Sequence, residues 1–116
     1  MPNTTITVST GRVFNTPYEV TSTSVSANAT AEFVMHDKDW KYTILITTTA
    51  ATNVTFKAPV KVSPFSAEDT TFALSADKTY AITIESGKFK NVDTDNYDKV
   101  VLTTDKAITV QIVKLP

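Results

Sequence analysis

The stretch WKYTILIT, residues 40–47, sets an apolar or aromatic side chain at every second position. Trp40, Tyr42, Ile44 and Ile46 therefore share one face of an extended chain, with mostly polar residues between them. A period of two is typical of a half-buried β-strand, because successive side chains of a strand point to opposite faces. The stretch predicts a strand with one face in a hydrophobic core.

The same alternation recurs in YAITIE, residues 80–85, and in AITVQIV, residues 107–113, and a helical spacing of three to four residues never establishes itself. Weaker alternation predicts further strands over the ranges 4–10, 18–25, 31–35, 53–58, 70–74 and 99–104. Short strands separated by polar turns are the pattern of a two-sheet fold. The sequence predicts an all-β, antiparallel β-sandwich of eight to nine short strands, either jelly-roll or immunoglobulin-like.

The length of 116 residues is enough for one core. No internal repeat and no composition shift marks a linker, so residues 1–116 are predicted to form a single domain. Pro59 and Pro64 predict an edge strand or a crossover between them, because proline cannot donate to a central ladder. Residues 1–10 hold little core-forming material, and the sequence leaves two alternatives for them. One is an extended arm whose Ile6 and Val8 contact a partner, and the other is an ordinary edge strand, with which the alternation of Ile6 and Val8 is also compatible.

Composition narrows the classes of function. A net charge of -1 gives no field that would attract polyphosphate, and Arg12 is the only arginine, so no nucleic-acid partner is expected. The absence of cysteine excludes disulfides, thiolate metal sites and a cysteine nucleophile. No apolar run approaches the roughly 20 residues of a membrane span, and the first residues lack the pattern of a signal peptide. We expect no membrane partner and synthesis or assembly in a cytoplasm.

The densest acidic cluster lies in IESGKFKNVDTDNYD, residues 84–98, beside one of only two glycines. The spacing of Asp93, Asp95 and Asp98 resembles the first oxygen positions of a calcium loop. However, the turning glycine and the bidentate glutamate of such a loop are missing, and nearby lysines supply counter-charge. The cluster is interpreted as a solvated surface loop without a metal.

No other pattern predicts a reaction centre. His36, the only histidine, has Asp37 and Asp39 as neighbours, but neighbours on a tight turn point apart and no second histidine completes a metal triad. Glu32 and Glu85 occupy strand positions where an outward-facing charge is sufficient. With two glycines, the chain has no phosphate loop, nucleophile elbow or dinucleotide fingerprint. The sequence predicts no enzyme and no catalytic, metal or cofactor site.

Aromatic side chains remain as candidates for contact with a partner. Trp40 and Tyr42 are in register with Ile44, which favours a place in the core. Other aromatic residues lie in or beside loops and are predicted to contact a partner, with local packing as the alternative: Phe14, Tyr18, Phe65 and Tyr97.

Several segments carry a resemblance to a known family. These are DKDWKYTILITTTAATNVTFKA (37–58), ESGKFKN (85–91), KVVLTT (99–104) and ITVQIVKLP (108–116). They resemble small all-β proteins of tailed bacteriophages that decorate or cement the capsid. The resemblance covers roughly residues 37–116, and the N-terminal third has no counterpart in it.

The resemblance implies a β-sandwich that binds the outer face of an assembled shell, often as a trimer, and adds contacts across capsomer boundaries. The implied partner is the major capsid protein, and the implied location is the virion surface after assembly in the host cytoplasm. A carbohydrate-binding or adhesin-type module is the alternative. An export signal, or exposed aromatic residues in a row, would favour that alternative. A small hydrolase ranks third, because no base, metal or nucleophile constellation is visible.

Overall fold

The computed structural model describes residues 4–35, 41–57, 69–84 and 99–116. Within these ranges the chain forms ten strands and no helix, which confirms the all-β prediction with more strands than expected. The strands are β1 (Thr4–Thr5), β2 (Val8–Thr10), β3 (Ser22–Val25), β4 (Thr30–Val34), β5 (Tyr42–Thr48), β6 (Thr52–Phe56), β7 (Thr70–Leu74), β8 (Thr79–Ile82), β9 (Lys99–Thr104) and β10 (Ile108–Lys114). The predicted crossover at residues 59–64 lies outside the described residues.

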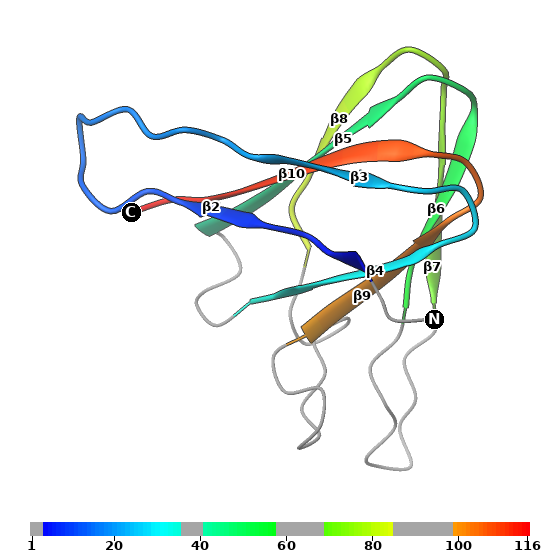
Figure 1. Ribbon diagram of the computed structural model, residues 1–116, viewed down its shortest axis with the longest axis horizontal. Helices are drawn as coiled ribbons and strands as arrows, with labels where there is room; N and C mark the ends of the chain where they lie inside the picture. Colours follow the sequence, from blue (N-terminus) through cyan, green and yellow to red (C-terminus); the bar gives the residue numbers. More distant parts are fainter. Residues whose placement is uncertain (1–3, 36–40, 58–68, 85–98) are drawn as a thin grey trace.

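The strands form two five-stranded sheets packed face to face (Figure 1). The first sheet has the order β1-β4-β9-β6-β7, and the second has β2-β10-β5-β8 with β3 also pairing β10. Six of the pairings are antiparallel. The N-terminal strands differ, because β1 is parallel to β4 and β2 is parallel to β10. The sandwich is therefore mixed, which corrects the expectation of a wholly antiparallel fold.

Strand β10 lies at the centre of the second sheet. Along its whole length it pairs with β5, from Ile108 opposite Thr48 to Lys114 opposite Tyr42. Its other side is divided between two strands, with β3 beside its first half and β2 beside its second half. The C-terminal strand thus holds the N-terminal part of the chain in place.

Four short connections join the sheets: β3 to β4, β5 to β6, β7 to β8 and β9 to β10, each crossing from one sheet to the other. We call these connections (residues 26–29, 49–51, 75–78 and 105–107) the turn end. Asn28 and Asp77 take positive φ values of 61° and 57° there, a conformation that Asn and Asp adopt more readily than most residues. The polar segments expected between short strands are found here, with Ala76 and Asp77 in a turn and Asp105 and Lys106 in a bend.

Buried threonines fix the turn end. Thr48 is 1% exposed, and its Oγ1 donates to the carbonyl of Ser75 at 2.5 Å and accepts from the N–H of Lys78 at 3.3 Å. Thr52 and Thr104 are also buried, and each hydroxyl donates to a turn carbonyl two residues away. A buried hydroxyl without a partner costs about 1–3 kcal/mol, so these bonds explain why threonine is tolerated in the interior.

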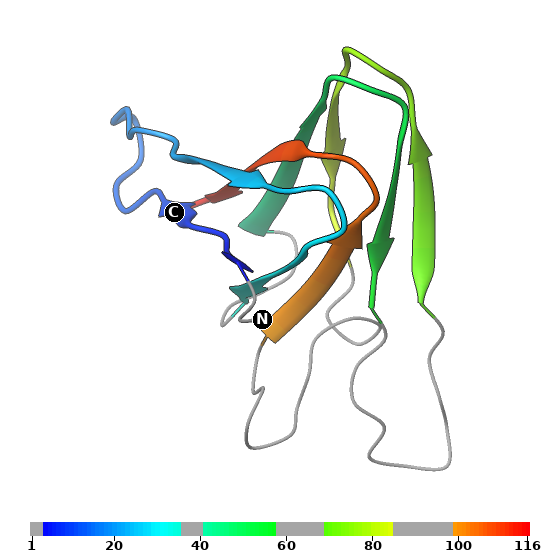
Figure 2. The same ribbon diagram turned by 45° about the vertical axis from the view of Figure 1, so that its right-hand side comes forward.

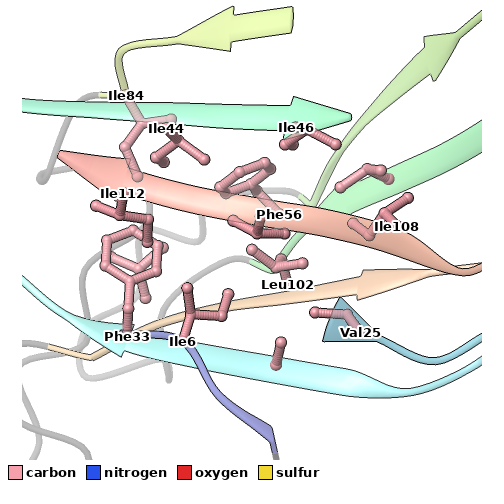
Figure 3. Close-up of a cluster of buried hydrophobic side chains, with 14 of the residues drawn as sticks. Ile6, Val25, Phe33, Ile44, Ile46, Phe56, Ile84, Leu102, Ile108 and Ile112 are labelled. Atoms are coloured by element: carbon pink, nitrogen blue, oxygen red, sulfur yellow. The ribbon is translucent and has the colours of Figure 1, made fainter. Parts of the chain in front are cut away.

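The core lies between the sheets and draws on all of the longer strands (Figure 3). Burial alternates strictly along β5 and along β9, as the period-two pattern predicted. The buried apolar residues are Ile6, Val25, Ala31, Phe33, Met35, Tyr42, Ile44, Ile46, Val54, Phe56, Leu74, Ile84, Val100, Leu102, Ile108, Val110 and Ile112. The strand faces assigned to WKYTILIT and AITVQIV are therefore confirmed where the structure describes them.

The outer faces explain the high threonine content. In the first sheet a row of threonines crosses four strands in register, and in the second sheet one serine and three threonines do the same. The rows are Thr30, Thr103, Thr55 and Thr71, and Ser24, Thr109, Thr47 and Thr79. Hydroxyl pairs within them lie 2.8 Å apart (Thr55 and Thr71) and 3.0 Å apart (Thr47 and Thr79). Cross-strand threonine pairs of this kind stabilise a sheet on its solvent face.

The N-terminal residues are part of the sandwich from Thr4 onward. Ile6 is 2% exposed and its N–H donates to the carbonyl of Glu32 at 2.8 Å, and Figure 3 shows its side chain in the core beside Phe33. After Ile6 the chain moves from the first sheet to the second, where Val8 pairs with Ile112. Over residues 4–10 the structure therefore shows the strand alternative in place of the arm, as two short strands on either side of the buried Ile6.

Candidate functional site

The acidic and histidine clusters weighed in the sequence, around Asp93 and His36, lie outside the described residues, as does Glu85. Glu32 lies on the outer face of β4, as expected, and its Oε2 is 3.0 Å from Nζ of Lys99. Among the described residues no group of three or more His, Asp or Glu side chains is placed to hold a metal ion. The candidate site in the described part of the chain is a surface for contact with a partner.

One segment projects from the sandwich. Residues 11–21, which connect β2 to β3 and which we call the tip loop, extend beyond the end of β10 and return (Figures 1 and 2). The chain's C-terminus lies beside the start of this loop in both views. The tip loop is held by two sheet strands but is not itself part of a sheet.

The base of the tip loop is fixed by hydrogen bonds. The N–H of Gly11 donates to the carbonyl of Lys114 at 2.8 Å, so the loop begins by extending the pairing of β2 with β10. On the returning side, the N–H of Thr21 donates to Oγ of Ser9 at 2.8 Å, and Ser9 is 7% exposed. Both ends of the loop are therefore tied to β2 and β10.

Packing supplements these bonds at Gly11. A Cβ placed there would lie 2.6 Å from Cε1 of Tyr18 and 3.1 Å from Cδ of Pro116, both closer than ordinary van der Waals contact. Glycine is needed because the ring of Tyr18 and the ring of Pro116 pack directly against the backbone. Tyr18 thus closes the base of the loop.

Several apolar side chains on and beside the loop are exposed. Phe14 is 74% exposed and Val13 is 61% exposed, while Leu115 beside the base and Val20 on the returning segment are 43% and 36% exposed. Two adjacent large apolar side chains in solvent are unfavourable for an isolated chain. Exposed apolar groups that gather at one place mark a contact surface more often than scattered ones do.

The backbone of the tip reverses at Asn15. Asn15 takes a φ of 61°, and Oγ1 of Thr16 donates weakly to the carbonyl of Phe14 at 3.4 Å. A positive φ is tolerated by asparagine better than by most residues, so a turn forms directly after the exposed pair. The loop carries one exposed charge of each sign, Arg12 and Glu19, and so has no net charge. The loop therefore exposes apolar side chains without a net charge.

The predicted contact residues have different outcomes. Phe14 is exposed on the tip loop, where a partner can reach it. Tyr18 is half-buried at the base, which matches the alternative of local packing. Ile6 is buried in the core and offers no surface to a partner, while Val8 is partly buried against the core. Phe65 and Tyr97 lie outside the described residues.

Sequence reasoning missed Val13, Val20 and Leu115. A sequence signal exists for Val13 alone: Val13 stands beside Phe14 in the run between Gly11 and Pro17, so these two apolar neighbours do not alternate with polar residues as they would in a strand. Such a pair between turn-forming residues cannot place both side chains in one core.

The chain was also compared with known proteins. No family model, no curated protein and no solved structure matches it. A search of the described residues finds no helix of the length and apolarity that a membrane crossing requires.

Proposed function

We propose that the protein is a non-enzymatic structural protein of a phage virion, which binds the outer surface of the capsid through its tip loop and stabilises the shell. The observation that carries the proposal is the pair Val13 and Phe14, 61% and 74% exposed on a loop whose base is fixed. An exposed aromatic anchor on a prearranged loop loses little conformational freedom on binding, which favours affinity.

The strand order supports a jelly roll as the fold behind this role. Eight strands follow the orders β3-β10-β5-β8 and β4-β9-β6-β7, which is the two-sheet arrangement of a jelly roll, with β1 and β2 added at one side. Jelly rolls occur in viral capsid domains and in lectins, so the fold is compatible with the proposal without selecting it.

Many weak contacts are sufficient to stabilise a capsid shell. A decoration protein binds a shell in many copies, so modest contact energy in each copy adds to a large total stabilisation. The tip loop, which has no net charge, would gain its energy from the desolvation of apolar side chains, and that energy changes little with salt. The proposed partner is the major capsid protein.

The test is co-sedimentation of the full chain with shells assembled from the major capsid protein encoded in the same genome. We expect the protein to pellet with the shells at a saturable ratio, to remain bound when salt is raised, and to raise the temperature at which the shells dissociate. A protein that stays in the supernatant at every ratio would refute the proposal.

A carbohydrate-binding module is the second candidate, and the exposure of Phe14 is the observation that favours it, because sugar rings stack on exposed aromatic faces. Tyr18, which could have extended such a platform, packs on Gly11 instead. Binding of the full chain to an array of glycans, lost on Phe14→Ser, would select this function over shell binding.

A further inference from the structure

We infer that the protein forms a two-fold symmetric dimer in which β7 of one copy pairs antiparallel with β7 of a second copy. The inference concerns the opposite side of the first sheet from the N-terminal strand β1, and it does not depend on shell binding. It replaces the trimer that the family resemblance implies with a pair whose geometry can be specified residue by residue.

Strand β7 is an open edge in the described part of the chain. It pairs with β6 on one side, and no described strand lies on the other (Figure 2). A strand edge presents unpaired N–H and C=O groups, and the group that satisfies such a row is another extended backbone. The chemistry of the edge therefore specifies a β-strand as the occupant.

The backbone groups that face this edge follow from the bonds of β6. The N–H of Asn53 donates to Oδ1 of Asp105 at 2.8 Å, and the N–H of Lys57 donates to the carbonyl of Val101 at 2.8 Å, so these residues point toward β9 and its turn. Because the direction alternates along a strand, Val54 points toward β7 and exchanges bonds with Phe72.

The same alternation applies along β7. Since Phe72 points back to β6, Thr71 and Ala73 direct their N–H and C=O groups outward. Both residues are exposed, and their side chains lie on the outer face of the sheet, where they leave room for an approaching strand. The edge therefore offers two donors and two acceptors, spaced two residues apart.

A second copy fits this edge because the edge is self-complementary. A two-fold axis beside Phe72 sets Thr71 of each copy opposite Ala73 of the other copy. Each of these two residue pairs exchanges two hydrogen bonds, which gives four in total. The strand, TTFAL, contains no charged residue that an identical strand would repel, and no proline or lysine of the kind that protects natural edges. The flanking charge, on Asp69, is paired with Lys57 at 3.4 Å.

Apolar contact supports the same axis. Phe72 packs edge-to-face on Phe56, with ring centroids 5.9 Å apart, yet it is only half-buried, whereas Phe56 is fully buried. In the dimer the two Phe72 residues would be a non-hydrogen-bonded pair, the arrangement in which opposite side chains are closest. The dimer thus covers the apolar surface that this edge leaves in solvent.

The other edges fit less well. Strand β1 has two residues, and pairing of β7 with β1 of another copy would give an open chain of molecules instead of a closed pair. Strand β8 is shorter than β7 and follows directly on Asp77 and Lys78. Among the described edge strands β1, β2, β3, β7 and β8, only β7 is five residues long, and its pair is closed and free of charged residues.

The mass of the protein in solution tests the pairing. Sedimentation equilibrium over a concentration series should show a rise from the 12.7 kDa of one chain toward twice that mass. Ala73→Pro removes one outward N–H in each copy and should keep the protein monomeric, whereas Thr5→Pro, on the opposite edge of the same sheet, should leave the dimer intact. A wild-type protein that stays monomeric or forms a trimer would overturn the inference.

Cross-linking tests the register without disturbing the core, because the chain has no cysteine of its own. In the proposed register residue 71 faces residue 73 of the second copy at a Cα separation of about 5.5 Å, within the range for a disulfide. A mixture of Thr71→Cys and Ala73→Cys proteins should form a disulfide-linked heterodimer on oxidation, and each variant alone should cross-link far less. Equal cross-linking in all three samples, or none in the mixture, would refute the register.

Discussion

The turn end and the tip loop invert the usual places of polar and apolar side chains. At the turn end, the hydroxyls of Thr48, Thr52 and Thr104 are buried, and each has a hydrogen-bond partner. In the tip loop, Val13 and Phe14 are exposed. In any globular chain most apolar groups are buried and most polar groups are exposed. A buried polar group or an exposed apolar group is therefore the more informative observation.

The difference separates the stability of the free chain from contact with a partner. The hydroxyl of Thr48 joins strand β5 to the connection between β7 and β8, and those of Thr52 and Thr104 fix their own turns, so the turn end contributes to the stability of the sandwich. Exposed apolar side chains contribute little to the stability of the free chain, and their surface becomes useful only when a partner covers it. Substitutions at the two places should therefore change different measured quantities.

The largest effect is expected at Ile6, which fixes where the sandwich begins. Ile6→Ala should lower the free energy of unfolding by roughly 2–5 kcal/mol, because the side chain is buried between the sheets and its loss leaves a cavity. Thr5→Ala, at an exposed neighbour, should change it by less than about 0.5 kcal/mol. Denaturant titration measures both values. A similarly small loss at both positions would support an extended arm instead of a strand.

The second effect concerns the turn end. Thr48→Val keeps the shape of the side chain but leaves the carbonyl of Ser75 and the N–H of Lys78 without the hydroxyl they share. We expect a loss of about 1–3 kcal/mol in the free energy of unfolding. Thr43→Val, on the outer face of the same strand, serves as the control; if it destabilised the protein as much as Thr48→Val, the hydroxyl bonds would not explain the stability of this end.

A smaller effect is expected at the base of the tip loop. Gly11→Ala would force the ring of Tyr18 to move and should cost about 1 kcal/mol, at the lower limit for overpacking because Tyr18 is only half-buried. Tyr18→Ala removes the two nearest atoms that a new Cβ would meet and leaves only Cδ of Pro116, at 3.1 Å. In a double-mutant cycle the two changes should cost less together than the sum of each alone, and strict additivity would contradict the packing described.

The smallest effect is a dependence on pH at Tyr80. Hydrogen bonds from Ser75, through its side chain and its backbone N–H, lower the pKa of the Tyr80 phenol below the ordinary 10.0. Because the folded pKa is lowered, stability relative to Tyr80→Phe should rise with pH from the folded pKa up to about pH 10, and this difference should not change with pH around neutrality. Unfolding midpoints across alkaline pH measure this, and parallel profiles for both proteins would contradict it.

Most of the sandwich could be predicted from sequence, because alternation along WKYTILIT and AITVQIV leaves one choice of inward face. The N-terminal strands could not, since two apolar residues in a threonine-rich segment are compatible with either a strand or an arm. What decided between these was tertiary: β10 offers a free edge to β2, and Glu32 offers a carbonyl to Ile6.

The candidate site was predicted in part. Phe14 was selected because an aromatic residue outside the alternating pattern has no obvious place in the core. Val20 and Leu115 could not be predicted, because their exposure depends on where the loop and the C-terminus leave the sheet, and local sequence does not contain that information. The packing of Tyr18 on Gly11 joins residues of one loop, but it also requires Pro116 from the other end of the chain.

The most direct test of the separation between stability and contact is Phe14→Ser measured in two ways, with Ala51→Ser at the turn end as the matched control. A thermal melt should place both variants within a few degrees of the wild type, because both residues are exposed. In co-sedimentation with capsid shells, Phe14→Ser should lose at least roughly tenfold in affinity while Ala51→Ser binds normally. A Phe14→Ser protein that melts much earlier, or that binds shells as tightly as the wild type, would contradict the account.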